Sequence, residues 1–166
     1  MMSVRYKAVV ALSLIVFFFF LDQATKYWAV QQLLGQEPIV FLNGLLTLVY
    51  AENAGAFLGL GGQWSREVRF VVFAVAVLAG LGFMLWYLIK KENSKLNFYA
   101  YSFILAGGLG NLWDRIFHEN GHVVDFLLLS LGGALRTGVF NVADMVIMCG
   151  VGLALWGLIL NRPQET

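Results

Sequence analysis

Four stretches of the 166-residue chain carry no charged side chain, and this feature constrains the fold more than any other. A helix needs about 20 mostly apolar residues to cross the hydrocarbon core of a bilayer. One of the stretches, residues 70–89, has that length by itself, and the other three reach it with their flanking turns. The sequence therefore predicts four transmembrane helices. They are expected at about residues 8–28, 67–89, 96–116 and 139–160.

The composition supports a single integral membrane domain covering residues 1–166. Hydrophobic residues make up 60% of the chain and charged residues 13%, whereas soluble domains have about 45–50% and about 25%. This balance excludes disordered, collagen-like and coiled-coil chains. The net charge of +1 gives no reason to expect a nucleic-acid partner.

The first apolar stretch follows Arg5 and Lys7, as in a secretory signal peptide. No small-residue cleavage site follows it, so we interpret it as a retained anchor, with a signal peptide as the alternative. The densest basic cluster is KKENSK at residues 90–95. The positive-inside rule then places this segment and both termini in the cytoplasm.

Two outer loops, at about residues 29–66 and 117–138, are expected on the opposite side of the membrane. Within the first loop, two apolar runs flank Asn43 and Gly44. Asn-Gly between apolar runs predicts a β-hairpin with a two-residue turn. The hairpin, residues 39–50, is too apolar for water and is expected to rest on the membrane surface.

Polar side chains gather at one predicted depth, near the outer ends of the spans. Ionisable groups in a membrane are costly and indicate a functional site. Asp125 belongs to the same level, because it lies in the loop that joins the last two spans. The other polar residues at this depth are Asp22, Asn111, Asp114, Arg115, Asn141 and Asp144.

Each of these residues also has a structural explanation. Asp22 and Lys26 have the i, i+4 spacing of a helix ion pair. Asp144 could stabilise a helix N-terminus, and Arg115 could extend to the lipid headgroups. The glycines at 107, 108 and 110 are typical of a close helix-packing face.

Two carboxyl groups that share a site cannot both ionise easily, so one holds a proton and the other is charged. Such a pair can activate a water molecule and protonate a carbonyl oxygen, as in aspartic proteases. A membrane transporter or assembly subunit is the non-enzymatic alternative, in which the acids would serve a proton or ion path. A transport path, however, needs polar groups through the whole membrane.

Residues 118–122 read HENGH and match the H-E-x-x-H pattern of zinc proteases. That pattern needs a helix, whereas Asn120-Gly121 is a strong turn signal. We therefore expect His118 and His122 to lie in a loop, with no metal ligands and no cofactor in this protein.

Five sequence blocks together resemble the lipoprotein signal peptidases, or signal peptidase II, a family of bacterial inner-membrane aspartyl proteases. The resemblance covers essentially the whole chain. The blocks are residues 22–26 (DQATK), 53–57 (NAGAF), 107–115 (GGLGNLWDR), 123–126 (VVDF) and 140–144 (FNVAD).

The resemblance implies an all-α membrane fold with a small β element. The family has four transmembrane helices, an extracytoplasmic β-cradle and a short periplasmic helix, which would fall at about residues 127–135. It implies that Asp125 and Asp144 are the catalytic pair. The supporting residues would be Asp22, Asn53, Asn111, Arg115 and Asn141.

The resemblance also implies the reaction. The family removes the signal peptide from bacterial prolipoproteins, just before a cysteine that carries diacylglycerol, and is inhibited by the cyclic peptide globomycin. By this resemblance we expect a monomeric, multi-pass protein of the inner membrane, in contact with lipid, with its active site on the periplasmic side.

Overall fold

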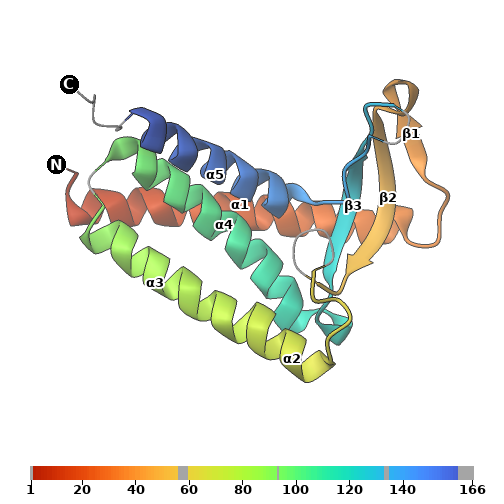
Figure 1. The fold of residues 1–166 in the computed structure, drawn as a ribbon, viewed down its shortest axis with the longest axis horizontal. Coiled ribbons are helices and arrows are strands. Elements are labelled where there is room, and N and C mark those ends of the chain that lie inside the picture. The colour runs from red at the N-terminus through yellow and green to blue at the C-terminus, as the bar shows by residue number, and fades with distance from the viewer. Residues whose placement is uncertain (1, 56–59, 93, 133–134, 161–166) are drawn as a thin grey trace.

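The computed structural model describes the whole chain except residues 1, 56–59, 93, 133–134 and 161–166. Helices form a bundle at one end and a small sheet stands at the other end (Figure 1). The helices are α1 (Val4–Leu33), α2 (Arg66–Phe70), α3 (Val77–Lys90), α4 (Lys95–Phe117) and α5 (Val142–Leu160). The strands are β1 (Ile39–Phe41), β2 (Leu46–Asn53) and β3 (Val123–Leu129).

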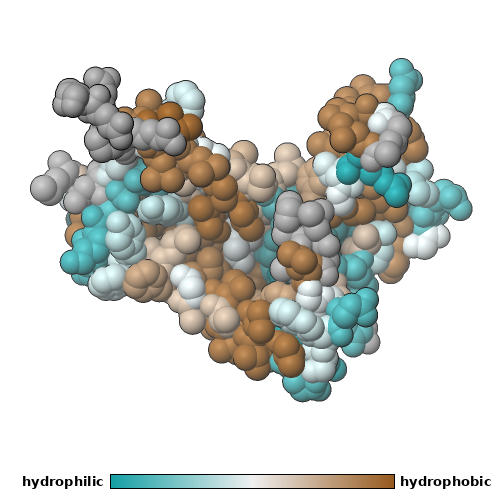
Figure 2. Space-filling view, in the orientation of Figure 1, coloured by the Kyte–Doolittle hydropathy of each residue, from teal (hydrophilic) through white to brown (hydrophobic). Residues whose placement is uncertain are grey.

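Three described helical segments are long and apolar enough to cross a membrane: Val4–Leu33, Arg66–Lys90 and Val142–Leu160. The second is one continuous helix, because the π-helical segment η3 (Val71–Ala76) joins α2 to α3. Most of their large apolar side chains are exposed, and apolar residues cover much of the bundle surface (Figure 2). Such a surface is stable only in lipid, so the chain is a membrane protein.

Helix α4 is the centre of the bundle and contacts α1, α3 and α5. Its buried side chains Phe98 and Leu105 pack in the main apolar core with Leu81 and Leu88 of α3. The start of α1, the turn between α3 and α4, and the end of α5 lie together at the end of the bundle far from the sheet (Figure 1).

Glycines bring α4 and α5 close together, as the sequence predicted for this face of α4. A Cβ atom at Gly107 would overlap the Ala143 carbonyl oxygen, and one at Gly110 would lie 3.2 Å from Ala143 Cβ and 2.6 Å from Asp22 Oδ2 of α1. Gly150 of α5 has the same role, because a Cβ there would lie 2.6 Å from the Ala100 oxygen. Gly108 instead faces Leu81 of α3.

The predicted hairpin is confirmed, but its turn is longer than two residues. Phe41 pairs with Leu46, so four residues connect the strands. Asn43 and Gly44 have φ angles of 54° and 91°, the left-handed region that these residue types accept.

The predicted short helix at about residues 127–135 is wrong for the described part of that segment. Residues 127–129 belong to β3, which pairs antiparallel with β2 from Leu46↔Leu129 to Asn53↔Val123. Beyond the strand, Ser130 and Arg136 form an isolated antiparallel β-bridge, and Gly132 has a φ of 96°. An edge of the hairpin was available for pairing, so the apolar run extends as a third strand.

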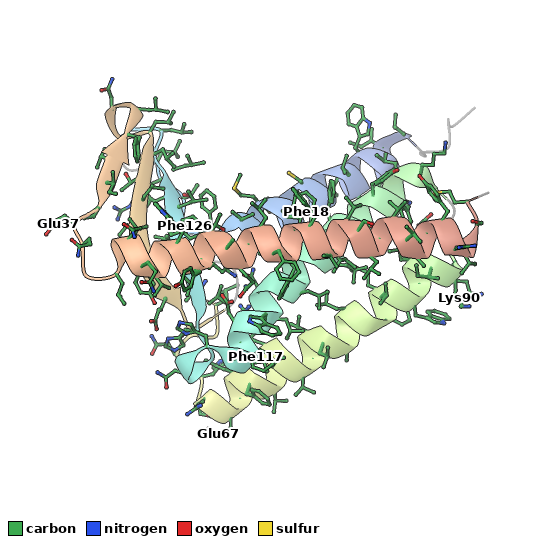
Figure 3. All side chains as sticks on the ribbon, turned by 180° about the vertical axis from the view of Figure 1, so that it is seen from behind. Phe18, Glu37, Glu67, Lys90, Phe117 and Phe126 are labelled. Atoms are coloured by element: carbon green, nitrogen blue, oxygen red, sulfur yellow. The ribbon has the colours of Figure 1, made fainter. Side chains whose placement is uncertain are left out.

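The sheet packs on the C-terminal end of α1. Phe126 of β3 packs in a buried cluster with Ala29 and Leu33 of α1, and Figure 3 shows it where the sheet meets the bundle. A register shift lies in β2 between Leu48, which pairs with Leu127, and Ala51, which pairs with Asp125. Such β-bulges redirect side chains and are frequent beside active sites.

We predict that Gly150→Ala destabilises the protein, because the new methyl group would overlap the backbone of α4. Overpacking of this kind costs about 1–3 kcal/mol. The matched control is Gly152→Ala on the same helix, where a Cβ would meet no atom within 4 Å. Free energies of unfolding in detergent micelles measure the difference, and equal values for the two variants would contradict the packing described here.

Candidate active site

Asn141 joins the two aspartates of the predicted pair, through its side-chain amide on one side and its backbone N–H on the other. Asp125 lies in the middle of β3 and is buried, with 2% of its surface exposed. Asp144 lies in the first turn of α5 and is half-buried. Asn141 Nδ2 donates to Asp125 Oδ1 at 2.7 Å, and the Asn141 backbone N–H donates to Asp144 Oδ2 at 3.2 Å. Strand β3 and the first turn of α5 thus meet at Asn141.

Asn141 and Asp144 also start helix α5. Asn141 Oδ1 accepts the Asp144 backbone N–H at 2.9 Å, while the Asp144 carboxylate accepts the Asn141 N–H. This reciprocal pair has the geometry of a capping box. Asp144 therefore has the capping role that the sequence allowed, and the same geometry fixes its carboxylate beside Asp125.

Asn111 of α4 holds the pair from the other side. Its Nδ2 donates to Asp144 Oδ1 at 2.8 Å, and its Oδ1 accepts Asn141 Nδ2 at 3.0 Å. Asn53, the last residue of β2, hydrogen-bonds the Asp125 side chain. The asparagines therefore bring α4, β2 and the start of α5 to the two carboxyl groups.

Arg115 lies in the last turn of α4, close to the pair but turned toward the loop after β2. Its guanidinium group donates to the Asn111 carbonyl at 3.0 Å and to the Gly55 carbonyl at 2.9 Å. It also lies over the ring of Phe73, 5.5 Å from the centroid. The residue thus ties η3 and the 53–55 turn to α4.

A buried charge network lies beneath the pair, and the sequence indicated only part of it. Lys26 Nζ is 2.8 Å from Asp22 Oδ2, which confirms the i, i+4 ion pair. The same ammonium group is 2.9 Å from Asp114 Oδ2 and donates to Asn111 Oδ1 at 3.1 Å. Gln23 Nε2 bridges Asp22 and Asp114 at 3.1 and 3.0 Å.

The two carboxylates of this network reach further elements of the fold. Asp22 accepts the Ala143 N–H of α5 at 2.8 Å, and Asp114 accepts the Val124 N–H of β3 at 3.2 Å. The sequence placed Asp114 at the depth of the predicted site and paired Lys26 with Asp22, but it gave neither residue a role in the site and missed Gln23. The presence of Gln23 in the DQATK block was the signal that could have found it.

The surroundings of Asp125 favour its neutral form. Burial, followed by the nearby charge of Asp144, raises the pKa of Asp125 from 3.8 to about 7. Hydrogen bonds from Asn53 and Asn141 oppose this shift but do not cancel it. The site can therefore hold one proton on the pair near neutral pH.

The H-E-x-x-H segment does not have the conformation of a zinc-protease helix. Helix α4 ends at Phe117, and residues 119–121 form a short 3-10 turn in which Asn120 has a φ of 59°. His122 Nδ1 lies 2.8 Å from Glu52 Oε2 of β2. The predicted loop is confirmed, and the two histidines do not share a helical face.

The fold is that of a bacterial membrane enzyme. Two solved structures described as bacterial membrane enzymes superpose with TM-scores of 0.76 and 0.78, at 25% and 26% identity. The matches cover 95% and 92% of this chain and 94% of each of the other two.

The family model of signal peptidase (SPase) II matches residues 14–160, and the chain belongs to this family of aspartic peptidases. A lipoprotein signal peptidase of Clostridium novyi is 33% identical, over 92% of this chain and 97% of the relative. One of Thermodesulfovibrio yellowstonii is 36% identical, over 91% and 93% of the two chains.

We predict that Lys26→Met destabilises the protein strongly. The methionine fills a similar volume but leaves Asp22 and Asp114 buried without their cation, which typically costs about 3–5 kcal/mol. The control is Lys95→Met, which removes an exposed ammonium group at the start of α4. Thermal unfolding in detergent should show a large loss of stability for the first variant and little change for the second.

We also predict that the stability contributed by Asp125 depends on pH. Its pKa is about 7 in the folded protein and 3.8 for an unperturbed aspartate side chain, so between these values the unfolded chain binds fewer protons. Stability should therefore decrease as the pH rises from about 4 to about 7. Asp125→Asn should remove this slope from a series of unfolding measurements, and an unchanged slope in the variant would assign it to another group.

Proposed function

We propose that this protein removes the signal peptide from prolipoproteins as a lipoprotein signal peptidase, with Asp125 and Asp144 as its catalytic pair. The observation that carries the proposal is the bridge through Asn141, which bonds both carboxyl groups. The curated relatives named above are lipoprotein signal peptidases. The supporting residues in this proposal are Asp22, Asn53, Asn111, Arg115 and Asn141.

We assign the proton of the resting pair to Asp125. Its buried position raises its pKa to about 7, so it is the general acid that protonates the carbonyl oxygen of the scissile bond. Asp144 accepts two N–H groups and lies in the first turn of α5, where a negative charge is favoured. Its carboxylate is the base that takes a proton from the attacking water.

The arrangement of the helices supports a topology with four spans, in which α4 crosses the membrane in addition to the three segments named above. Lys90 lies at the end of the bundle far from the sheet, whereas Glu37 and Glu67 lie at the sheet end (Figure 3). Arg5 at the start of α1 and Lys95 at the start of α4 lie at the same end of the bundle as Lys90. Under the positive-inside rule this end and both termini are cytoplasmic, and the active site is periplasmic.

The sheet provides a surface for the lipid-modified part of a substrate. Its tip exposes apolar side chains, among them Val40, Phe41 and Leu42, and forms an apolar patch separate from the bundle (Figure 2). We propose that this tip rests in the outer leaflet. A diacylglyceryl cysteine, anchored in the same leaflet, would then present the preceding peptide bond to the pair.

A transport function is less well supported by the distribution of buried charge. Among the described residues, the buried charged side chains at the sheet end are Asp22, Lys26, Asp114 and Asp125. At the opposite end, Lys7 and Glu92 are buried, and Lys7 donates to the Glu92 carbonyl. The two groups are separated by the apolar core of the bundle, so these charges do not form a continuous path.

We predict that Asp125→Asn and Asp144→Asn each abolish cleavage of a diacylglyceryl-modified prolipoprotein. Asparagine keeps the shape and can accept hydrogen bonds, but it cannot exchange the proton. The double variant should be little worse than either single one, because the two residues act as a unit. The measurement is the mass shift of the substrate after incubation with purified protein.

The control for this experiment is Glu52→Gln, which removes an acid of β2 that hydrogen-bonds Tyr50 and contacts His122. It should cleave at the wild-type rate. Substantial turnover by a well-folded Asp144→Asn variant would mean that Asp144 serves only as part of the helix cap. Binding of globomycin by the inactive variants would show that the site remains formed.

The absence of a catalytic metal is tested separately. We predict that His122→Ala keeps most of the activity and that EDTA has no effect, because the two histidines flank a turn. Loss of activity in EDTA, with recovery on adding zinc, would overturn the assignment to an aspartate pair.

A further inference from the structure

A cavity lined by arginines lies beside the active site. Its volume is about 530 Å³, and it lies between the start of the Arg66–Lys90 helix and the end of α4. Its cationic side chains come from Arg66, Arg69 and Arg115. Glu67 is the one acid of its lining among the described residues and is exposed. The cavity therefore carries a net positive charge.

Arg115 is held in place at this cavity. Its hydrogen bonds to the Asn111 and Gly55 carbonyls and its position over Phe73 fix the guanidinium group. Phe73 belongs to η3, a π-helical segment, and such segments are frequent at functional sites. Guanidinium groups bind phosphate oxygens with two parallel hydrogen bonds, so the cluster is suited to a phosphate group.

An apolar groove of about 330 Å³ lies next to this cavity, between α1, α3 and α4. Its walls come from α1 and α3 and its floor from α4, with side chains such as Phe19, Leu78 and Trp113. Ile116 lines both the cavity and the groove, so the two are neighbours on either side of this residue. Figure 3 shows α1 and α3 diverging toward the sheet end, with α4 between them.

We propose that the cavity and the groove together bind one anionic phospholipid of the membrane. The phosphate group would lie among the arginines, and an acyl chain would lie in the groove. A neutral diacylglyceryl group would leave the positive charge uncompensated, and free phosphate would leave the apolar groove empty. This proposal goes beyond the peptidase activity and does not depend on it.

The position of the lipid would couple it to the catalytic pair. Arg115 lines the cavity and donates to the carbonyl of Asn111, whose side chain bonds Asp144. A bound phosphate would therefore stabilise the last turn of α4 in the conformation that supports the active site.

Native mass spectrometry of the full-length protein tests the proposal. The delipidated protein is mixed in detergent with equal amounts of phosphatidylglycerol and phosphatidylcholine that carry the same acyl chains. The wild-type protein should retain mainly phosphatidylglycerol. The double variant Arg66→Gln/Arg69→Gln should retain about tenfold less, since each arginine contributes to the attraction of an anionic lipid.

Matched variants separate this site from general charge effects. Arg136→Gln removes an exposed arginine outside both linings and should retain the lipid. Glu67→Gln should increase retention, a gain that misfolding would not produce. Leu78→Trp should reduce retention by filling the groove, whereas Leu85→Trp, exposed on the same helix outside both linings, should not.

Three results would overturn the proposal. The first is equal retention of the two lipids by the wild-type protein. The second is an equal loss of lipid in the Arg136→Gln and double arginine variants. The third is retention that millimolar inorganic phosphate abolishes while Leu78→Trp leaves it unchanged, because the site would then bind free phosphate and not a lipid. Melting temperatures of all variants must stay close to that of the wild type.

Discussion

The buried ammonium group of Lys26 connects the parts of the fold that form the site. It bonds Asp22 of its own helix and Asp114 of α4, and these carboxylates accept backbone N–H groups from α5 and β3. In a medium of low dielectric constant, an unpaired buried charge is costly, so the partners must stay together. One lysine thus fixes α1, α4, α5 and β3 relative to one another.

Next to this network, Asn141 makes both the hydrogen bonds that start helix α5 and those that hold the two carboxyl groups of the site. Asn141 caps α5 through Asp144 and bonds Asp125 through the other end of its side chain. The helix therefore begins where the carboxyl groups meet. Glycine contacts between α4 and α5 bring Asn111 within reach of Asp144. A change in helix packing would displace the site, which is why its supporting residues are also structural ones.

Much of the fold could be predicted from local patterns, and the errors have a common cause. Charge-free stretches indicated the helices, and Asn43-Gly44 indicated the hairpin. The helix at about residues 127–135, which the family resemblance implied, was wrong, and periodicity could not have corrected it because a short apolar run fits a buried strand or a helix equally well. Only pairing with β2 distinguishes the two. The turn length likewise followed from the register of the strands, which local sequence does not fix.

By itself the sequence determined that the chain belongs in a membrane, because its apolar stretches cannot be covered in water. It also indicated which polar residues lie at one depth. Only the tertiary structure decided which of them bond. The N–H of Ala143 reaches Asp22 across 121 positions of the chain, and a bulge in β2 sets the register beside Asp125. Such contacts depend on how helices and strands pack in space, and no local spacing of residues encodes them.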